Sequence, residues 1–221
     1  MKDFTIICSL ILLFTSCGDN INIEPQQAIS TNVALSDEQG IKTAIIGTYD
    51  MLSWLPATSS GDVIVNSELF ADTENLIWTD FPIPLTQVLN KNIAPTNTVV
   101  EHFWIYSYRT INQTNTILNK IEDIEEIDTE VLGAEVRFIR GLVYFDLISM
   151  FSLPWTAGDP ESMVGVPIVS TPAEESLDNP EVLRNSVAEV YDFILDDLIF
   201  AKEHLPEQNE EFANTYAASV L

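Results

Sequence analysis

Cys17 is the residue of this chain whose type and setting most clearly predict a chemical modification. It follows an apolar run over residues 4–14 and then two small residues, while Lys2 gives the start of the chain a positive charge. The run is shorter than the ~20 apolar residues that span a bilayer, but it suits the hydrophobic region of a secretory signal. We therefore predict a lipoprotein signal peptide over residues 1–16 and acylation of Cys17, for example with palmitate, after cleavage. The alternative is an ordinary signal peptide that is cut at a nearby small residue.

The sequence lacks the residue sets of the common catalytic chemistries. It has no HExxH or GxSxG pattern and no glycine-rich phosphate loop. The two histidines, His102 and His204, lie at predicted helix ends, and we interpret them as surface or capping residues. Acidic pairs such as Asp196–Asp197 and Glu174–Glu175 are interpreted as solvated surface, because carboxylates abound in this chain. We therefore predict no catalytic residue, no metal site and no cofactor.

The charge balance excludes several classes of partner. Nine Lys and Arg residues stand against 34 Asp and Glu residues, which gives a formal net charge of -25. A surface of this sign repels phosphate backbones and anionic lipid headgroups, so we predict no nucleic-acid partner and no electrostatic docking to membranes. With 46% apolar residues, the chain has enough material to bury a hydrophobic core.

Beyond the signal, the sequence predicts helices that are joined by polar or proline-containing loops. Three predicted helix starts carry the residue pair of a capping box, in which two side chains satisfy free backbone N–H groups. These pairs are Ser36 with Gln39, Thr98 with Glu101, and Ser186 with Glu189. A further helix is predicted over about residues 130–151, and a last one begins near Phe212. No segment has the period of a strand, so the predicted fold class is all-α.

Each predicted helix has one apolar face. These faces are lined by Ile41, Ile45, Tyr49 and Leu52; by Trp104, Tyr108, Ile111 and Leu118; by Phe138, Leu142, Phe145 and either Ile148 or Ser149; and by Val190, Ile194, Leu198 and either Ala201 or Leu205. Asn115 lies on the second face, where an unpaired amide is costly, so we expect it to be hydrogen-bonded to a neighbouring helix or loop. Gly141 and Ala134 are small enough to let helices approach closely.

Four segments carry a recognisable residue pattern in a fixed order. They are residues 104–115 with Trp104, Tyr108, Ile111 and Asn115, residues 133–154 (GAEVRFIRGLVYFDL, then Phe151 and Pro154), residues 165–167 (Gly-Val-Pro), and residues 184–206 from Arg184 to Pro206. Behind a lipoprotein-like leader, these segments resemble the SusD/RagB family of outer-membrane nutrient-binding lipoproteins. The departures are mild: a glycine stands at position 141 where the family usually has alanine, and Ser152-Leu153 replaces a glycine-containing turn.

The resemblance implies a tetratricopeptide-like array of paired antiparallel helices with long irregular loops, although no repeat of ~34 residues is evident. The family's chains are typically more than twice as long, so the resemblance also implies a fragment or truncated product that is incomplete at its C-terminus. The expected organisation is a signal peptide over residues 1–16, a tether over residues 17–35 and a SusD-like helical domain over residues 36–221.

The resemblance further implies a function without catalysis. In this family, a lipid-anchored protein at the outer surface of a Bacteroidetes-type outer membrane captures an oligosaccharide or other nutrient. It then hands the nutrient to a SusC-like TonB-dependent transporter. The alternative is a lipid-anchored helical scaffold that mediates protein–protein interaction and binds no small ligand.

A ligand site for sugars would combine exposed flat aromatic rings with a few amides and carboxylates. Residues 56–97 show no helical period, contain four prolines and supply this mixture, and long irregular segments are often functional. The predicted ligand-binding residues are Asn75, Trp78, Asp80 and Phe81, with Trp78 as the stacking platform. The alternative is that Trp78 and Phe81 pin the segment onto the helices. Trp104, in contrast, is predicted to belong to the core.

Overall fold

The computed structural model describes residues 30–54, 61–71, 76–79, 82–124, 128–175 and 182–221. Residues from Leu35 to Leu221 form one compact unit, and the short helix α2 (Thr31–Ala34) lies in the unit that precedes it. Within the described ranges there is no strand, and the only bridge is an isolated pair, Val164 with Ser186. The predicted all-α fold class is confirmed.

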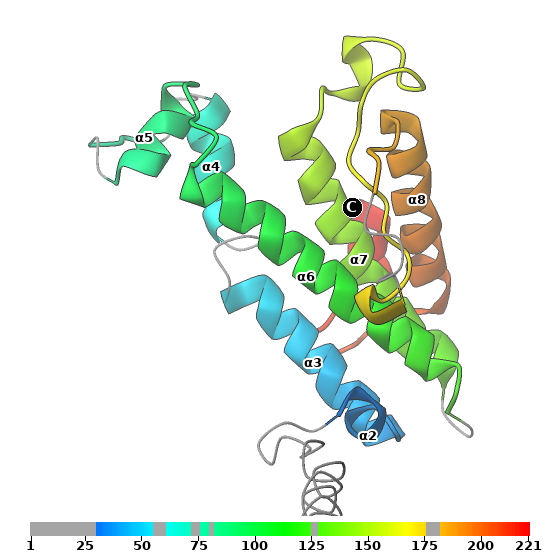
Figure 1. The fold of residues 1–221 in the computed structure, drawn as a ribbon. Helices are drawn as coiled ribbons and strands as arrows, with labels where there is room; N and C mark the ends of the chain where they lie inside the picture. The colour runs from blue at the N-terminus through cyan, green and yellow to red at the C-terminus, as the bar shows by residue number, and fades with distance from the viewer. Residues whose placement is uncertain (1–29, 55–60, 72–75, 80–81, 125–127, 176–181) are drawn as a thin grey trace, which may run out of the picture. The chain divides into compact units, whose positions relative to one another are not determined.

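Four long helices form the body of this unit: α3 (Glu38–Trp54), α6 (Thr98–Ile121), α7 (Thr129–Phe151) and α8 (Val187–His204). Helix α7 packs against both α6 and α8, α3 packs against α6 and α7, and the short helix α9 (Thr215–Val220) packs against α8. Successive long helices run in opposite directions in Figure 1. The expected array of paired antiparallel helices is therefore present.

The buried faces follow the predicted spacing on α8 and depart from it on α7. Val190, Ile194 and Leu198 of α8 are buried as expected. On α7 the predicted Phe138, Leu142 and Phe145 are only half-buried, whereas the residues without exposed surface are Val136, Ile139, Val143, Tyr144 and Leu147. Since α7 packs between two neighbours, it buries more than one face, and the apolar period cannot single out one of them.

Gly141 lets α7 approach α8 closely, as predicted. A Cβ at this position would lie 3.2 Å from Leu198 Cγ and 3.5 Å from Asp197 Cβ. An alanine here would fit only if the Leu198 side chain shifted by a few tenths of an ångström.

The helix caps differ from two of the three predicted capping boxes. The box of Ser186 and Glu189 is present at the start of α8. At α6 the capping residue is Asn97, whose side chain accepts from the backbone N–H groups of Val99 and Val100, so Thr98 is the first helical residue rather than the cap. Helix α3 begins at Glu38, after the Asp37 carboxylate, which accepts a 2.7 Å hydrogen bond from Gly40 N. Asn and Asp are at least as good as Ser and Thr as N-caps. The capping-box pattern requires Ser or Thr at the cap, so it does not identify Asn97 or Asp37.

The expectation of a segment without helices over residues 56–97 is wrong. Helices α4 (Gly61–Ala71) and α5 (Ile83–Leu89) lie within it. The apolar residues of α4 lie on more than one side of the helix, since Leu69 is buried while Ile64 and Phe70 are exposed. The sequence of α4 therefore lacks the apolar period of an amphipathic helix. Proline is tolerated in the first turn of α5, where no intrahelical N–H is needed.

The predicted last helix also starts late: α9 begins at Thr215, after the Asn214 cap, instead of near Phe212. An extended segment, residues 164–171, connects the end of α7 to the start of α8 and is here called the strap. The strap crosses α6 and α7 and is held there by polar side chains of both helices.

Candidate functional site

A buried ion pair joins α7 to α8. Arg140 Nε and Nη2 donate to the two carboxylate oxygens of Asp197 at 2.7 and 2.8 Å, and the two side chains are 7% and 2% exposed. The interpretation of Asp197 as solvated surface is therefore wrong. Position 197 lies three residues after Ile194 and four before Ala201, on the buried face of α8. A charged residue at a core position, opposite an arginine-bearing helix, is the signal that could have revealed the pair.

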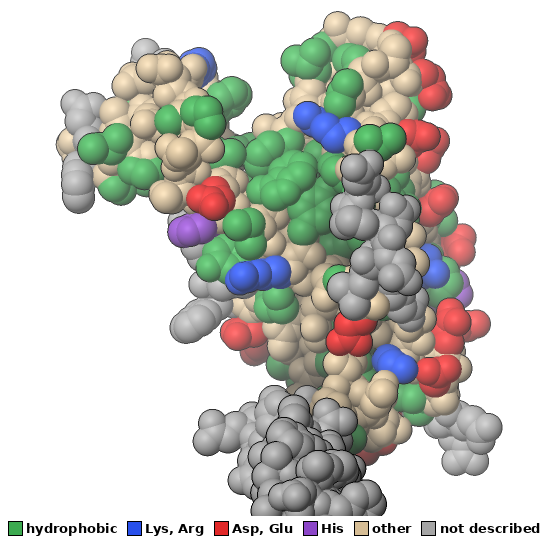
Figure 2. Space-filling model, viewed as in Figure 1, with side chains coloured by type: hydrophobic (Ala, Val, Ile, Leu, Met, Phe, Trp, Pro, Cys, Tyr) green, Lys and Arg blue, Asp and Glu red, His purple; other side chains and the backbone are tan. Residues whose placement is uncertain are grey.

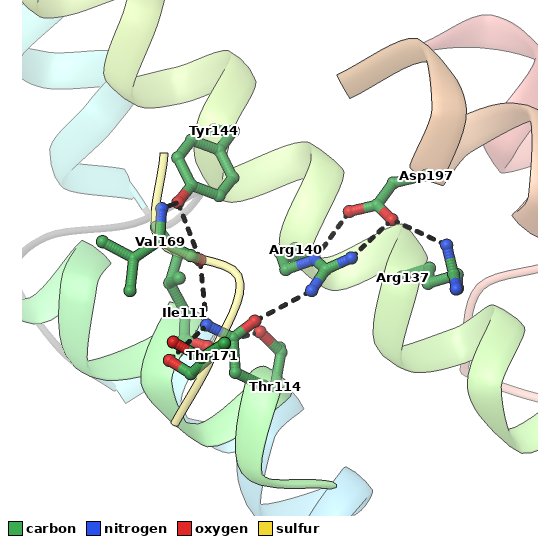
Figure 3. Close-up of polar contacts among 9 residues, drawn as sticks. Ile111, Thr114, Arg137, Arg140, Tyr144, Val169, Thr171 and Asp197 are labelled. Carbon is green, nitrogen blue, oxygen red and sulfur yellow. Dashed lines mark hydrogen bonds and ion pairs between the residues drawn. The ribbon is translucent and has the colours of Figure 1, made fainter. Parts of the chain in front are cut away.

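Asn115 extends this ion pair to the strap. Its Oδ1 accepts from Arg140 Nη1 at 2.8 Å, and its Nδ2 donates to the carbonyl oxygens of Val169 at 2.9 Å and Thr171 at 3.4 Å. Figure 3 shows these contacts passing from α8 through α7 and α6 to the strap. The expectation that Asn115 is hydrogen-bonded to a neighbouring helix and loop is confirmed.

Tyrosine hydroxyls hold the strap at two further points. Tyr144 OH accepts from Val169 N at 2.8 Å and donates to Val169 O at 3.2 Å, while Tyr108 OH donates to Pro167 O at 2.8 Å. Burial raises the pKa of Tyr144 to about 12 and raises the pKa of Tyr108 as well. Both phenols therefore keep the proton that they donate at any physiological pH. These hydrogen bonds hold the strap in position against α6 and α7.

An open hollow lies on α6, beside the end of the strap. It has a volume of about 610 Å³ and is lined by Trp104, Ile105, Tyr108, Arg109, Asn112 and Ala173. Hydrophobic side chains gather over this part of the molecule in Figure 2. Trp104 and Ile105 also line a second hollow of about 440 Å³ toward the start of α6, so the indole lies between the two.

The polar and aromatic groups of this hollow are held in place by their neighbours. The Trp104 ring packs 4.9 Å from the rings of both Tyr108 and Phe151, and it is only half-buried. Asn112 Oδ1 accepts from Ala173 N at 2.7 Å, which orients its amide. The Arg109 side chain is exposed, with its guanidinium 5.2 Å from the centre of the Tyr106 ring. A fixed aromatic face beside an amide and a guanidinium is suited to a ligand with apolar faces and hydroxyl groups.

The prediction that Trp104 belongs to the core holds in part, because the residue packs against buried core residues but is itself only half-buried. Helical spacing shows which face of α6 the indole shares, but it cannot show how far the neighbouring helix covers that face. The sequence does carry a signal for this hollow. Residues four apart lie on the same side of a helix, so the spacing predicts that Trp104, Tyr108 and Asn112 are neighbours on the surface of α6.

Trp78 is the one predicted ligand-binding residue that the structure describes. Its ring is half-buried, and its Nε1 donates to Thr86 Oγ1 of α5 at 3.0 Å. It is not among the residues that line the hollow on α6. Asn75, Asp80 and Phe81 lie outside the described residues, as does Cys17.

The histidines occupy the positions expected of surface and capping residues. His102 is exposed on α6, and His204 ends α8 with its Nδ1 2.9 Å from Phe200 O. Among the described residues, no three His, Cys, Asp or Glu side chains are grouped in a way that could hold a metal ion. A search of the same residues finds no helix with the length and apolar character needed to cross a membrane.

Comparison with known proteins identifies relatives over most of the chain. Residues 24–220 match the SusD-like family, described as starch-binding and associating with the outer membrane. The SusD-like protein P38 of Formosa agariphila is 27% identical over 95% of this chain and 38% of its own length.

Solved structures of this family share the fold. A SusD superfamily protein from Bacteroides fragilis superposes with a TM-score of 0.68 at 21% identity, over 84% of this chain and 44% of its own. A laminarin-binding SusD-like protein superposes with a TM-score of 0.65 at 21% identity, over 82% of this chain and 38% of its own. The chain thus spans less than half the length of these relatives. The match over residues 24–220 and the shared tetratricopeptide-like helical fold place this chain in the SusD-like family.

Proposed function

We propose that this chain is part of a surface lipoprotein that captures an oligosaccharide and hands it to a SusC-like TonB-dependent outer-membrane transporter, without catalysing a reaction. Family membership carries the proposal, because the family is described as starch-binding and outer-membrane-associated. A structural neighbour that binds laminarin supports a glycan ligand. The net charge of -25 favours a neutral glycan over an anionic one.

We place the sugar on the hollow of α6. A pyranose ring offers apolar C–H faces, which would stack on the exposed side of Trp104, and hydroxyl groups, which would reach Asn112 and Arg109. The segment that carries Asn75, Trp78, Asp80 and Phe81 supplies a second contact for a longer oligosaccharide. The hydrogen bond of Trp78 to Thr86 holds its ring in one orientation, which suits a stacking platform.

Binding titrations with neutral oligosaccharides test this placement. We expect Trp104→Ala to weaken binding by about tenfold or more, as for a central aromatic anchor, and Trp78→Ala to weaken binding of the longer oligosaccharides. Trp155→Ala is the matched control, because Trp155 is also a partly exposed tryptophan with an edge contact, to Tyr191, but does not line the hollow. Equal affinities of the Trp104→Ala variant and the wild type would reject the hollow as the sugar site.

The anchor and the transporter are tested in the native membrane. Gentle detergent extraction of the outer membrane, followed by capture of this protein, should bring down a barrel of TonB-dependent transporter size. The captured chain should lose its membrane attachment when Cys17 is replaced by serine. Recovery of the protein without a barrel would remove the support for transfer and would favour the scaffold that binds no small ligand.

A further inference from the structure

The hollow of α6 also indicates which kind of sugar it binds, an inference that rests on the proposed glycan capture. Among the described residues that line it, none is acidic, and Arg109 is the basic one. The three other arginines of the chain are each held by the Asp197 carboxylate or by backbone carbonyl oxygens. Arg109 is exposed and contacts the Tyr106 ring, but it forms no ion pair or hydrogen bond with any residue that the structure describes. Its guanidinium is therefore available to a ligand.

Asn112 adds free N–H groups beside this guanidinium. Its Oδ1 accepts from the backbone N–H of Ala173 at 2.7 Å, and because a backbone nitrogen only donates, this contact distinguishes the oxygen of the amide from its nitrogen. Nδ2 donates to no described residue and, unlike Asn66 Oδ1 and Ser107 Oγ, it is not buried. A ligand can therefore reach the N–H groups of Asn112.

The side chains of the hollow offer more hydrogen-bond donors than acceptors. Nε1 of Trp104 also lacks a described acceptor and is not buried, so it adds a donor to those of Arg109 and Asn112. The Tyr108 hydroxyl donates its proton to Pro167 O, which leaves only a lone pair on its oxygen. Arg109 and Asn112 are three residues apart on α6 and are thus neighbours on its surface. A ligand group that accepts two hydrogen bonds and donates none complements this pair.

Two substituents of natural sugars offer such an acceptor, a carboxylate and the carbonyl oxygen of an acetyl group. The net charge of -25 opposes the approach of an anion. The Tyr108 ring and the exposed methyl group of Ala173 line the same hollow as Asn112, and Ala173 lies at hydrogen-bond distance from it. A methyl group on the ligand would cover this apolar surface, whereas a carboxylate has none to bring. Charge and apolar surface therefore both favour the acetyl group.

We propose that the hollow of α6 selects a sugar that carries an acetyl group. The carbonyl oxygen of the acetyl group accepts from Asn112 Nδ2 and the Arg109 guanidinium, and its methyl group packs against Ala173 and the Tyr108 ring. An acetyl ester and an acetyl amide share this chemistry, and both leave the glycan neutral. Asn112 and Arg109 are then specificity-determining residues, while Trp104 supplies the stacking that any pyranose would use.

Four matched oligosaccharides test the selection by titration calorimetry. They are cellotetraose, the same chain with one O-acetyl group on each sugar, the same chain oxidised to carboxylates at its primary hydroxyl groups, and tetra-N-acetylchitotetraose. We expect one or both of the acetylated compounds to bind about tenfold more tightly than cellotetraose, and the stronger of them identifies the ester or the amide as the ligand.

Three results would overturn the selection, and they bear differently on glycan capture. Equal affinities of cellotetraose and both acetylated compounds would overturn the selection but leave the hollow as a sugar site. Tightest binding of the carboxylate would show that Arg109 selects charge instead. No binding of any of the four would overturn the selection together with the sugar site itself.

Two variants assign the preference to the named donors. Asn112→Asp keeps the acceptor for Ala173 N and replaces Nδ2 by an oxygen, so the preference for the acetylated compound should fall below about twofold. Gln113→Glu is the matched control, because it makes the same change on the next residue of α6, which does not line the hollow. Arg109→Met, at an exposed position, should also reduce the preference. An acetyl preference that survives both Asn112→Asp and Arg109→Met would overturn the proposal.

Discussion

Two regions of the molecule differ in how their buried polar groups are hydrogen-bonded. One is the junction, where the strap meets α6, α7 and α8, and the other is the end of the molecule formed by α4 and α5. At the junction, Arg140, Asp197 and Asn115 are buried, and each is hydrogen-bonded to another member of the network. At the α4–α5 end, Asn66 is equally buried but its Oδ1 has no described partner. Complete satisfaction makes a unique and rigid arrangement, whereas a buried acceptor without a partner costs stability.

The two regions also differ in how they cover apolar surface. Val166 of the strap is fully buried, although Val164 at its start is 57% exposed. Helices α4 and α5 bury Leu69 and Val88 but leave Ile64 and Ile83 each 65% exposed. Burial of apolar side chains and saturated hydrogen bonds are what give a region high local stability. The junction is therefore the most firmly held part of this fold, and the proposed sugar hollow lies at its margin.

Removal of the Arg140 guanidinium should be the most damaging change at the junction. Arg140→Met leaves the Asp197 carboxylate buried with only Arg137 near it, at 3.4 Å, and should lower the free energy of unfolding by about 3–5 kcal/mol. Denaturant unfolding measures this change. Arg137→Met is the control, because that side chain is 36% exposed and should lose less than about 1 kcal/mol. Similar losses in the two variants would break the comparison.

Removal of the Tyr144 hydroxyl should have a smaller and more local effect. Tyr144→Phe leaves Val169 N without its acceptor, and we expect a loss of about 1–2 kcal/mol together with faster hydrogen exchange of the Val169 amide. Trp78→Phe removes a side-chain hydrogen bond at the other region, between Trp78 and Thr86. Because that site is closer to solvent, its loss should be smaller, and a larger loss there would reverse the ranking of the two regions.

The cap of α6 links the α4–α5 end to the body of the fold. The Asn97 side chain caps α6 and also donates from Nδ2 to Pro84 O at 2.9 Å and Gln87 Oε1 at 2.8 Å. Asn97→Ala should cost about 1–2 kcal/mol, whereas Thr98→Ala should change the thermal midpoint little. A greater loss of stability in Thr98→Ala than in Asn97→Ala would contradict Asn97 as the cap and would favour the predicted capping box of Thr98 and Glu101.

The smallest expected effect concerns pH. Burial raises the pKa of Glu135, whose Oε1 accepts from Asn209 Nδ2. The folded chain therefore binds this proton more tightly than the unfolded chain, so the contribution of Glu135 to stability falls as pH rises from its unfolded pKa through its raised folded pKa. Glu135→Gln, which keeps the acceptor for Asn209, should raise the thermal midpoint at pH 7 and give no gain below pH ~4. A gain that is independent of pH would contradict this assignment.

Sequence patterns predicted features that depend on residues close together in the chain. They failed for contacts between residues that are far apart in the chain. The spacing of Val190, Ile194 and Leu198, with the capping box at Ser186, was sufficient to predict α8. Asp197 was misassigned because its partner Arg140 lies 57 residues away. The short helices α4 and α5 were missed, since neither has a one-sided apolar period.

The candidate site was less predictable than the fold. Helical spacing put Trp104 on an apolar face, and only the folded structure shows that this residue stays half-buried and lines the hollow. A surface hollow of this kind depends on how helices and loops far apart in the sequence pack together, which local sequence patterns do not show.

A crystal structure with a bound laminari-oligosaccharide tests the proposed glycan capture most directly. We expect a sugar ring stacked on the exposed side of Trp104, with ring atoms within about 4–4.5 Å of the indole and hydroxyl groups near Asn112 and Arg109. A glycan bound away from α6, or no glycan at saturating concentration, would contradict the site proposed on this chain.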